Sequence, residues 1–579
     1  MDELRTQVRR VLIEDPGNFP RNFKPGRDAV SKCDLPQVWQ NVESYDHSSH
    51  LNRCESIASM ISYVEYFQPW SPDDGSPIIF TQDQNEALNK IFKWASAVVL
   101  PSAAYSVEFV QTESDEPTAD IKRAQDESRW ESDLALQLLT VMTKLLGSMS
   151  GRLPDDVAVA DFTLALACTV NPKEPWTSNS VHTGAALLQT IWLTALEDRG
   201  NKLWSALEVI LKERIKPLFA KTPSPAITAA GRKNFHPLSL PRFDSMDESN
   251  KPWKTTDVYV GSALTWMIDQ YSPEDKKHLE EHFPLYVPAI LAMIDDSNMC
   301  FKTMGCELIK NLLRRVKACK SDILQRTNLT SVFEEAITPV LLSLPSITPE
   351  ESSIFCLSEA YPALLALFQT AYQNPTSKNK AKDTEKYYNS LSKVLRSNII
   401  SSLHHISSST PAAASTQTSF PYPRLSAQLI TMAGLFVEEL GINTVKYLQD
   451  LIPIFYTTLS NPFGFEVSHL GLTLSAAMVL QGVIKNGHPR IWRWRSELLS
   501  GLSTAWIHAA EDTSTSDEEK GMLEHELKVA VQVLLHVLQN PVTIPGDNSQ
   551  KEQMKAKTEM VADVKKFVGA DPILKPLFF

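Results

Sequence analysis

The amino-acid sequence predicts an all-α protein in which helical hairpins stack side by side into a solenoid. Three observations favour this fold class. Apolar residues recur at helical spacing along almost the whole 579-residue chain, and no stretch of useful length alternates apolar and polar residues as a strand would. In addition, two separate segments each describe a helix, a tight turn and a second helix. We therefore expect a core that continues from one hairpin to the next.

The first hairpin lies between Phe283 and Val316, with its turn at Asp295 and Asp296. One hairpin cannot bury the apolar stripes of both its helices, whereas stacked hairpins can. This pattern is typical of HEAT-like or armadillo-like helical repeats. The two stripes are Val287, Ile290, Leu291 and Ile294, then Phe301, Met304, Leu308, Ile309, Leu312 and Val316.

The second hairpin runs from residue 448 to 484, with a turn at 461–464, and Pro453 has the place that Pro288 has in the first hairpin. Such a proline bends the first helix of a HEAT unit around its partner. Asp295 or Asp296 and the later Lys302 stand where charge-assisted hydrogen bonds can link neighbouring turns. Because exposed ion pairs contribute only about 0–1 kcal/mol, we expect apolar burial to dominate stability.

Helical patterning extends well beyond the two hairpins. The segment 126–146 shows it clearly, because its leucines and Met142 recur on one face. The predicted helices are 82–99, 126–146, 156–170, 181–196, 202–219, 256–271, 273–295, 299–317, 331–344, 349–372, 382–404, 424–440, 444–459, 465–485, 488–510, 517–538 and 551–568.

Segments rich in Pro, Ser, Thr and charge, without an apolar stripe, predict linkers at 221–252, 373–383 and 407–420. The first is the best candidate for a domain boundary. It divides an N-terminal helical region (1–220) from a C-terminal region of helical repeats (253–579). The acidic stretches 113–133 and 511–519 are expected to be solvated.

Net charge and the length of the apolar runs argue against nucleic-acid and membrane partners. The formal net charge is −12 and the isoelectric point is about 5.6, which disfavours nucleic-acid binding driven by phosphate neutralisation. The N-terminus lacks a basic start followed by an apolar core, and the longest apolar run, 470–484, is too short to span a membrane and contains Gln481. We expect an intracellular protein, cytoplasmic and nuclear, with no nucleic-acid or membrane partner.

The seven cysteines predict reduced, passive thiols, because they are scattered and form no CxxC pair. Cys300 and Cys306 lie about 240° apart around a predicted helix, so they do not converge on one metal ion. The seven are Cys33, Cys54, Cys168, Cys300, Cys306, Cys319 and Cys356.

One short segment matches a zinc-peptidase pattern. His278, Glu281 and His282 fit HxxEH, in which two histidines bind zinc and a glutamate activates water. Pro284 follows closely and would disturb a long metal-bearing helix, so the sequence favours an exposed helical turn. No GxxxxGK[ST], GxGxxG or GxSxG motif occurs in the chain. We expect no catalytic residue, cofactor or metal, and the protein is expected not to be an enzyme.

A basic, tryptophan-containing segment at 485–495 is the candidate partner-binding surface. Tryptophan and arginine concentrate in interface hot spots, and this cluster lies within an acidic protein. The alternative is that Trp492 packs into the core while the arginines extend to solvent. Trp253, Trp266 and Met267 are expected in the core. The candidate residues are Arg490, Trp492, Arg493, Trp494 and Arg495.

Between residues 252 and 506 the chain resembles the Tel-two-interacting proteins, and within them the family of the second such protein, the smallest subunit of the TTT co-chaperone complex. The resemblance depends on ordered motifs: the tryptophan-containing start at 252–257, the segment 283–288 that leads to Asp295, and the later helices. The further motifs are Lys302 with Gly305, Val332-Phe333-Glu334-Glu335-Ala336, and Glu359-Ala360-Tyr361-Pro362-Ala363-Leu364-Leu365.

The resemblance implies a non-catalytic adaptor that joins the first Tel-interacting protein and the Tel-two protein. It further implies that this complex works with the ninety-kilodalton heat-shock chaperone and an AAA+ ATPase adaptor. The clients would be phosphatidylinositol-3-kinase-related kinases, which links the chain to TOR signalling and the DNA-damage response. Composition fits a HEAT-type transport or tethering scaffold equally well, and that alternative remains open.

Overall fold

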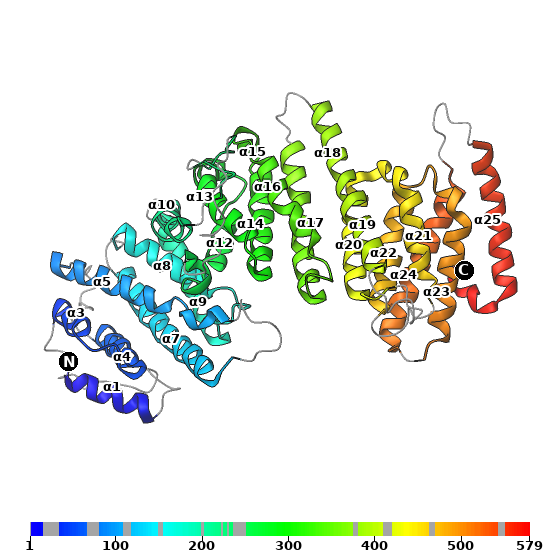
Figure 1. Ribbon diagram of the computed structural model, residues 1–579. Coiled ribbons are helices and arrows are strands. Elements are labelled where there is room, and N and C mark those ends of the chain that lie inside the picture. Colours follow the sequence, from blue (N-terminus) through cyan, green and yellow to red (C-terminus); the bar gives the residue numbers. More distant parts are fainter. Residues whose placement is uncertain are drawn as a thin grey trace. The chain divides into compact units, whose positions relative to one another are not determined.

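A computed structural model shows an α-helical chain (Figure 1). No strand occurs in the described part of the chain, where one isolated antiparallel bridge joins Ile227 and Lys233. The all-α prediction is therefore confirmed. The structure describes residues 2–14, 34–66, 80–107, 117–148, 154–198, 202–221, 224–228, 231–235, 250–373, 380–408, 420–461, 469–513, 515–541 and 550–579.

The chain divides into two compact units, Met1–Met293 and Ile294–Phe579. This division falls at the end of the first helix of the first predicted hairpin, so the two helices of that hairpin belong to different units. The domain boundary predicted at 221–252 lies elsewhere in the chain than this division, and it stays a prediction. Residues 236–249 of that segment lie outside the described residues.

Part of the predicted linker is folded onto the N-terminal unit. Residues 224–228 and 231–235 form a turn in which the Thr228 amide donates to the Arg232 carbonyl at 2.8 Å. Gly231, with φ of +66°, lies so close to Pro284 that a Cβ atom would stand 2.9 Å from the Cβ of that proline. Only glycine fits this turn without displacing the helix that contains Pro284.

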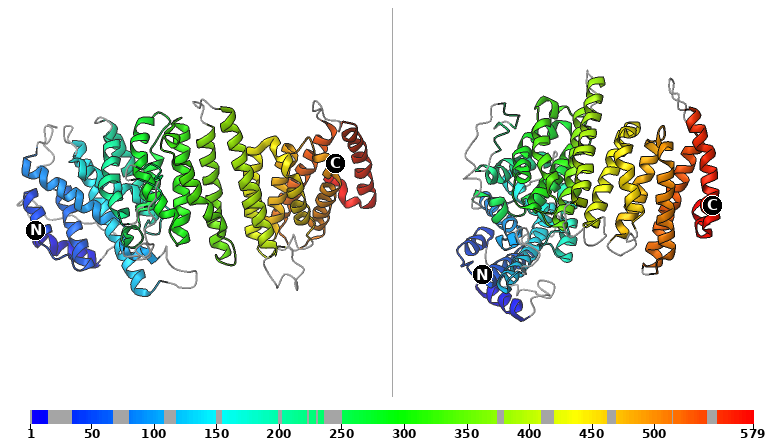
Figure 2. Two further views of the ribbon diagram at one scale, coloured as in Figure 1. Left: turned by 45° about the horizontal axis from the view of Figure 1, so that its top comes forward. Right: turned by 45° about the vertical axis from the view of Figure 1, so that its right-hand side comes forward.

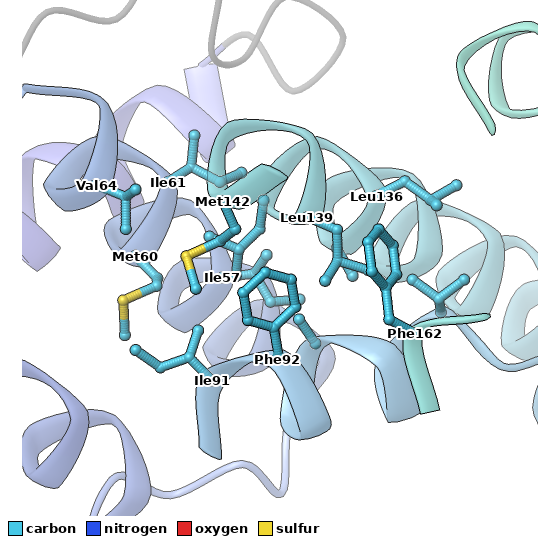
Figure 3. Packing of buried hydrophobic residues seen from close by; sticks show 14 of the residues in the cluster. Ile57, Met60, Ile61, Val64, Ile91, Phe92, Leu136, Leu139, Met142 and Phe162 are labelled. Atoms are coloured by element: carbon cyan, nitrogen blue, oxygen red, sulfur yellow. The ribbon is translucent and has the colours of Figure 1, made fainter. Parts of the chain in front are cut away.

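In the N-terminal unit, four helices enclose the core shown in Figure 3: α4, α5, α7 and α8. Ile57 and Ile61 of α4, Phe92 of α5 and Met142 of α7 lie together in it, fully buried. The helices of this unit are α1 (Asp2–Glu14), α3 (Leu35–Glu43), α4 (His50–Tyr66), α5 (Gln82–Val99), α7 (Ala119–Ser148), α8 (Asp156–Thr169), α9 (Asn179–Asp198), α10 (Leu203–Val209), α11 (Pro252–Thr255), α12 (Val260–Asp269) and α13 (Lys276–Ile294).

Helix α7 begins earlier than predicted and includes part of the acidic stretch 113–133. Within that stretch Ser132 is buried and its hydroxyl donates to the Val99 carbonyl at 3.0 Å. Burial also raises the pKa of Asp133. The expectation of a solvated stretch is therefore wrong for this end of it, because α7 packs on α5.

In the C-terminal unit, α14, α17, α20, α22 and α24 each pack on the next and form one layer (Figures 1 and 2). A second layer contains α16, α18–α19, α21 and α23, and α25 packs on α24. The helices are α14 (Met299–Ala318), α15 (Ile323–Arg326), α16 (Thr330–Ile337), α17 (Glu350–Tyr372), α18 (Lys380–Val394), α19 (Ser401–Ser408), α20 (Pro423–Leu440), α21 (Leu448–Leu459), α22 (Leu470–Asn486), α23 (Arg495–Glu511), α24 (Asp517–Gln539), α25 (Gln550–Ala570) and α26 (Lys575–Phe578).

Neighbouring helices of the first layer run parallel. Between α17 and α20, the Glu350 side chain accepts from the Leu425 amide near the starts, and Gln369 donates to Glu439 near the ends. Parallel neighbours in one layer require a return helix in the other layer. This is the geometry of stacked helical hairpins, and it confirms the predicted solenoid class.

Two stretches, Glu350–Tyr372 and Pro423–Leu459, are long and apolar enough to cross a membrane by length and composition alone. The first is α17, which packs between α14 and α20. The second contains α20 and α21, with Gly441 at φ +52° after the last residue of α20. Their burial, 61% and 50% of the apolar window, is that of core helices.

Candidate partner-binding surface

The candidate segment 485–495 connects α22 to α23 in the C-terminal unit. After α22 ends, a 3₁₀ turn (η12, Ile491–Trp494) leads directly into α23. Ile491 is fully buried and anchors the turn, whereas Arg493 is exposed. Trp492 is half-buried, and its indole Nε1 donates to the Pro489 carbonyl at 3.2 Å. The turn is thus held to the core at one residue and presents its neighbours to solvent.

Arg493 and Trp492 form a cation–π pair on this turn, with the guanidinium carbon 5.2 Å from the centre of the indole ring. Such a pair holds the arginine in place while its outer edge can still meet a partner. Trp494 and Arg490 are half-buried beside it. These four residues stay candidates for partner binding.

Arg495, the fifth candidate residue, is also bonded to another helix. Only 14% of its side chain is exposed, and its guanidinium contacts two carboxylates of α25: Glu559 at 3.0 Å and Asp563 at 3.0 Å. These bonds link α23 to α25. A charge reversal, Arg495→Glu, would place like charges together and should loosen α25.

The hairpin residues predicted from sequence are positioned as follows. Pro288 lies inside α13 and Pro453 inside α21, each six residues before its helix ends at Ile294 or Leu459. Asp296 is buried, and its Oδ1 accepts from the Asn298 amide at 2.8 Å. Asp295 is exposed and Lys302 half-buried. The predicted link between neighbouring turns stays a prediction, and the turn residues 462–464 of the second hairpin lie outside the described residues.

Sequence reasoning missed a row of polar contacts across the first layer of the C-terminal unit, which we call the polar ladder. It consists of Lys310–Glu359 between α14 and α17, Gln369–Glu439 between α17 and α20, and Gln481–Glu526 between α22 and α24. The latter two hydrogen bonds are both 2.7 Å long. Each partner lies 45 or more residues from the other in sequence, so no local pattern could have paired them.

The HxxEH segment is exposed at Glu281 but not at its second histidine. His282 is buried, and its Nδ1 lies 2.7 Å from the hydroxyl of Tyr271, which in turn lies 3.1 Å from that of Tyr286. Trp204 stacks on His278, with ring centres 4.9 Å apart. The expectation of exposure is wrong for His282, because its ring is buried against Tyr271.

Pro284 also does not end this helix, since α13 continues through both Pro284 and Pro288. Among the described residues, the ligand atoms of His278, Glu281 and His282 do not form a group close enough to share one metal ion. Burial lowers the pKa of His282, consistent with a neutral ring bonded to Tyr271. His282 thus belongs to the core of the N-terminal unit, whereas Glu281 is exposed and His278 is half-buried.

The cysteines that the structure describes are free thiols, and all but the half-buried Cys300 are buried. Burial raises the pKa of Cys54 to about 12 and also raises that of Cys306, so these thiols are protonated at neutral pH. Cys33 lies outside the described residues. The core prediction also agrees with the burial of Trp253 and Met267, while Trp266 is half-buried.

Residues 162–466 match the model of the Tti2 family. This match covers more than half of the chain and begins in α8, well before residue 252, where the sequence motifs placed the start of the resemblance. The candidate turn at 491–494 follows the matched region. No curated protein matches the chain at a significant level.

Several solved structures are similar to this chain at low identity. One is a Kap121p mutant, 13% identical with a TM-score of 0.39, over 93% of this chain and 50% of that chain. Another is Kap121p bound to Pho4p, 11% identical with a TM-score of 0.23, over all of this chain and 68% of that one. The chain spans about half the length of the first. TM-scores this low establish no functional relationship.

Proposed function

Because the chain belongs to the Tti2 family, we propose that it is a non-catalytic adaptor subunit of the TTT co-chaperone complex. In this role it binds the first Tel-interacting protein and the Tel-two protein. Through that complex, together with the heat-shock chaperone and the AAA+ ATPase adaptor, it supports the maturation of phosphatidylinositol-3-kinase-related kinases. The family match over residues 162–466 is the observation that carries this proposal.

The physical character of the chain supports an adaptor. Layers of stacked helices expose a large, continuous surface, and such surfaces commonly bind the helices or extended segments of other proteins. The polar ladder and the apolar core hold the layer of the C-terminal unit together, so its surface is fixed before a partner arrives. Rigid surfaces lose little conformational entropy on binding.

Within this role, the turn at Ile491–Trp494 is the proposed partner-contact site. Its arginines and tryptophans are the residue types that dominate interface energetics. The turn is positioned by buried Ile491 and by the Arg495 bonds to α25. A positively charged turn on a chain of net charge −12 fits an acidic patch of a partner.

Affinity purification of the tagged chain from its native cells, followed by mass spectrometry, tests the function. Recovery of the other two TTT subunits is expected, and depletion of the chain should lower the abundance of the related kinases. Normal kinase levels after depletion, with neither subunit recovered, would exclude the proposal. Recovery of transport cargo or coat proteins would favour the tethering scaffold instead.

The contact site needs a separate test with matched variants. Arg493→Glu should weaken binding of the purified first Tel-interacting protein or Tel-two protein at least about tenfold, while the melting temperature stays unchanged. Arg396→Glu, also an exposed arginine of the C-terminal unit, is the control and should bind as the native chain does. Equal binding by both variants would remove this turn from the interface and leave the adaptor function standing.

We also propose that the protein works in the cytoplasm and the nucleus. Free thiols among the described cysteines fit a reducing compartment. Imaging of the tagged chain in its native cells tests this, and an exclusively extracellular or organellar signal would contradict it.

A further inference from the structure

Three potential metal ligands meet where α4 packs on α7, far from the proposed contact turn in sequence. His50 is the first residue of α4, Cys54 follows one helical turn later, and Glu131 comes from α7. Residues four apart on a helix share one face, so both α4 side chains point toward α7. The ligand atoms of the three residues all lie within 4.8 Å of one another.

The three side chains are close enough to share one ion after the His50 ring turns one nitrogen toward Cys54. Cys54 Sγ lies 3.7 Å from Nε2 and 3.8 Å from Nδ1 of His50. Two ligands of one tetrahedral zinc ion are about 3–4 Å apart, given zinc–ligand bonds of 2.0–2.3 Å. His50 Nδ1 and Glu131 Oε1 are closer, at 2.6 Å, so the carboxylate would have to move outward slightly.

The surroundings hold the trio in place. The ring of Trp130 packs against His50 with centres 5.1 Å apart, and Arg53 donates to Oε1 of Glu131 at 2.7 Å. Beneath it, the apolar contact between α4 and α7 runs through Ile57, Ile61 and Met142 (Figure 3). Ligands supported by such packing lose little freedom when they bind a metal.

A surface cavity of about 480 Å³ reaches His50, the outermost of the three residues. Its walls include His50, Trp130 and Glu127, so the cavity opens directly onto the histidine. Cys54 and Glu131 lie behind His50 and are largely buried. An entry path from solvent and partial burial of the ligands are both needed for a stable metal site.

We propose that His50, Cys54 and Glu131 bind one zinc ion, with a water molecule from the cavity as the fourth ligand. An imidazole, a thiolate and a carboxylate are a ligand set that suits zinc. On binding, the S–H bond of Cys54 breaks, the sulfur binds zinc, and the proton leaves to solvent. No electron is transferred, because zinc has no redox chemistry.

In the zinc-bound state the charges of zinc, its ligands, Arg53 and Glu127 sum to zero, while Lys122, Arg123 and Asp126 also line the cavity. Zinc and Arg53 carry three positive charges, and the Cys54 thiolate, Glu131 and nearby Glu127 carry three negative ones. Glu127 is close enough to influence Cys54 electrostatically. A bound cation reverses the effect of burial on a thiol, since it deprotonates a coordinating cysteine outright. Zinc would therefore join α4 to α7 within the N-terminal unit.

The test uses the full chain with a histidine-free tag, stripped by a chelator and then dialysed against zinc chloride. One zinc per chain is expected by elemental analysis, together with a higher melting temperature. Cobalt(II) in place of zinc should give the charge-transfer absorption of a cobalt–thiolate bond. Cys54→Ala should weaken zinc binding at least about tenfold and abolish that absorption.

Cys168→Ala is the matched control, because Cys168 is a buried free cysteine of the same unit that does not belong to the trio. It should keep both the zinc and the cobalt–thiolate absorption. Glu131→Gln is the second test variant if Cys54→Ala unfolds, and it should weaken zinc binding likewise. A native chain that takes up no zinc, or equal zinc binding by the native chain and a folded Cys54→Ala or Glu131→Gln variant, would overturn the proposal.

Discussion

Helix α4 of the N-terminal unit and helix α20 of the C-terminal unit both lie in a core, but they are buried in different ways. Every residue of α4 from Cys54 to Val64 is buried, including Glu55 and three serines. In α20, burial follows one face, and Thr431 and Glu438 on the other face are exposed. Periodicity of apolar residues reveals a helix of the second kind and misses one of the first kind.

The difference has a physical reason in the serines of α4. A serine inside a helix can satisfy its hydroxyl by donating to the carbonyl one turn back, as Ser62 does to Ala58 at 2.8 Å. Such a serine can be buried like an apolar residue, although sequence rules count it as polar.

Charge substitutions should have the largest effect on the stability of either helix. Ala58→Asp in α4 and Leu429→Asp in α20 both place a carboxylate in the core and should cost several kcal/mol of folding free energy. Thr431→Asp is the control on the exposed face of α20 and should stay within about 0.5 kcal/mol. Chemical denaturation monitored by circular dichroism measures all three. A tolerated Ala58→Asp would show that α4 is not buried all round.

Close packing between the parallel helices gives the next largest effect. A Cβ on Gly434 of α20 would lie 3.0 Å from a methyl group of Val479 of α22. Gly434→Leu should therefore destabilise the protein by about 1–3 kcal/mol through overpacking. Gly471→Leu, where a Cβ would meet nothing within 4 Å, should be neutral or slightly stabilising. Equal melting temperatures for the two variants would contradict the α20–α22 contact.

Substitution of one serine of α4 should increase the stability of the protein. The Ser59 hydroxyl is buried and has no hydrogen-bond partner among the described residues. Ser59→Ala should stabilise the protein, raising its free energy of unfolding by about 1 kcal/mol. The substitution removes an unsatisfied polar group and improves helix propensity. Ser62→Ala removes a hydroxyl that is bonded and should gain less. Calorimetric melting of both variants measures the two gains. A larger gain from Ser62→Ala would contradict the view that Ser59, and not Ser62, has the unsatisfied hydroxyl.

The smallest effect is a pH dependence confined to the N-terminal unit. Burial lowers the pKa of His282 below its ordinary value of 6.5, so the unfolded chain binds a proton that the folded chain does not. Stability should therefore fall as the pH drops below about 6.5 towards the folded-state pKa. His282→Gln should flatten this part of the melting temperature–pH profile. An unchanged slope would assign the pH dependence to other groups.

Much of the fold could be predicted from the sequence. The helix at 82–99 has the bounds of α5, and the helices predicted at 299–317, 424–440 and 517–538 differ from α14, α20 and α24 by one residue at an end. These helices have one apolar face or clear end signals, such as the Thr81–Gln84 capping box of α5. Helices α1, α3 and α4 were not among the predicted ones.

The candidate surface could be predicted only in part. Residue types pointed to the segment around Trp492, but they could not show that Arg495 bonds to α25, because Glu559 and Asp563 lie more than 60 residues further on. The polar ladder and the stacking of Trp204 on His278 could not be predicted for the same reason. Such pairs form only when separate helices come together.

The sequence by itself determined that this chain is helical and built from hairpins, because apolar spacing within one helix is a local property that burial requires. Its ordered motifs also pointed to its family. Only the tertiary structure decided which polar groups are buried and with what partner: His282 with Tyr271, Arg495 with α25, and Cys54 with His50 and Glu131. Those outcomes depend on helices distant in sequence, whose side chains become neighbours only after packing.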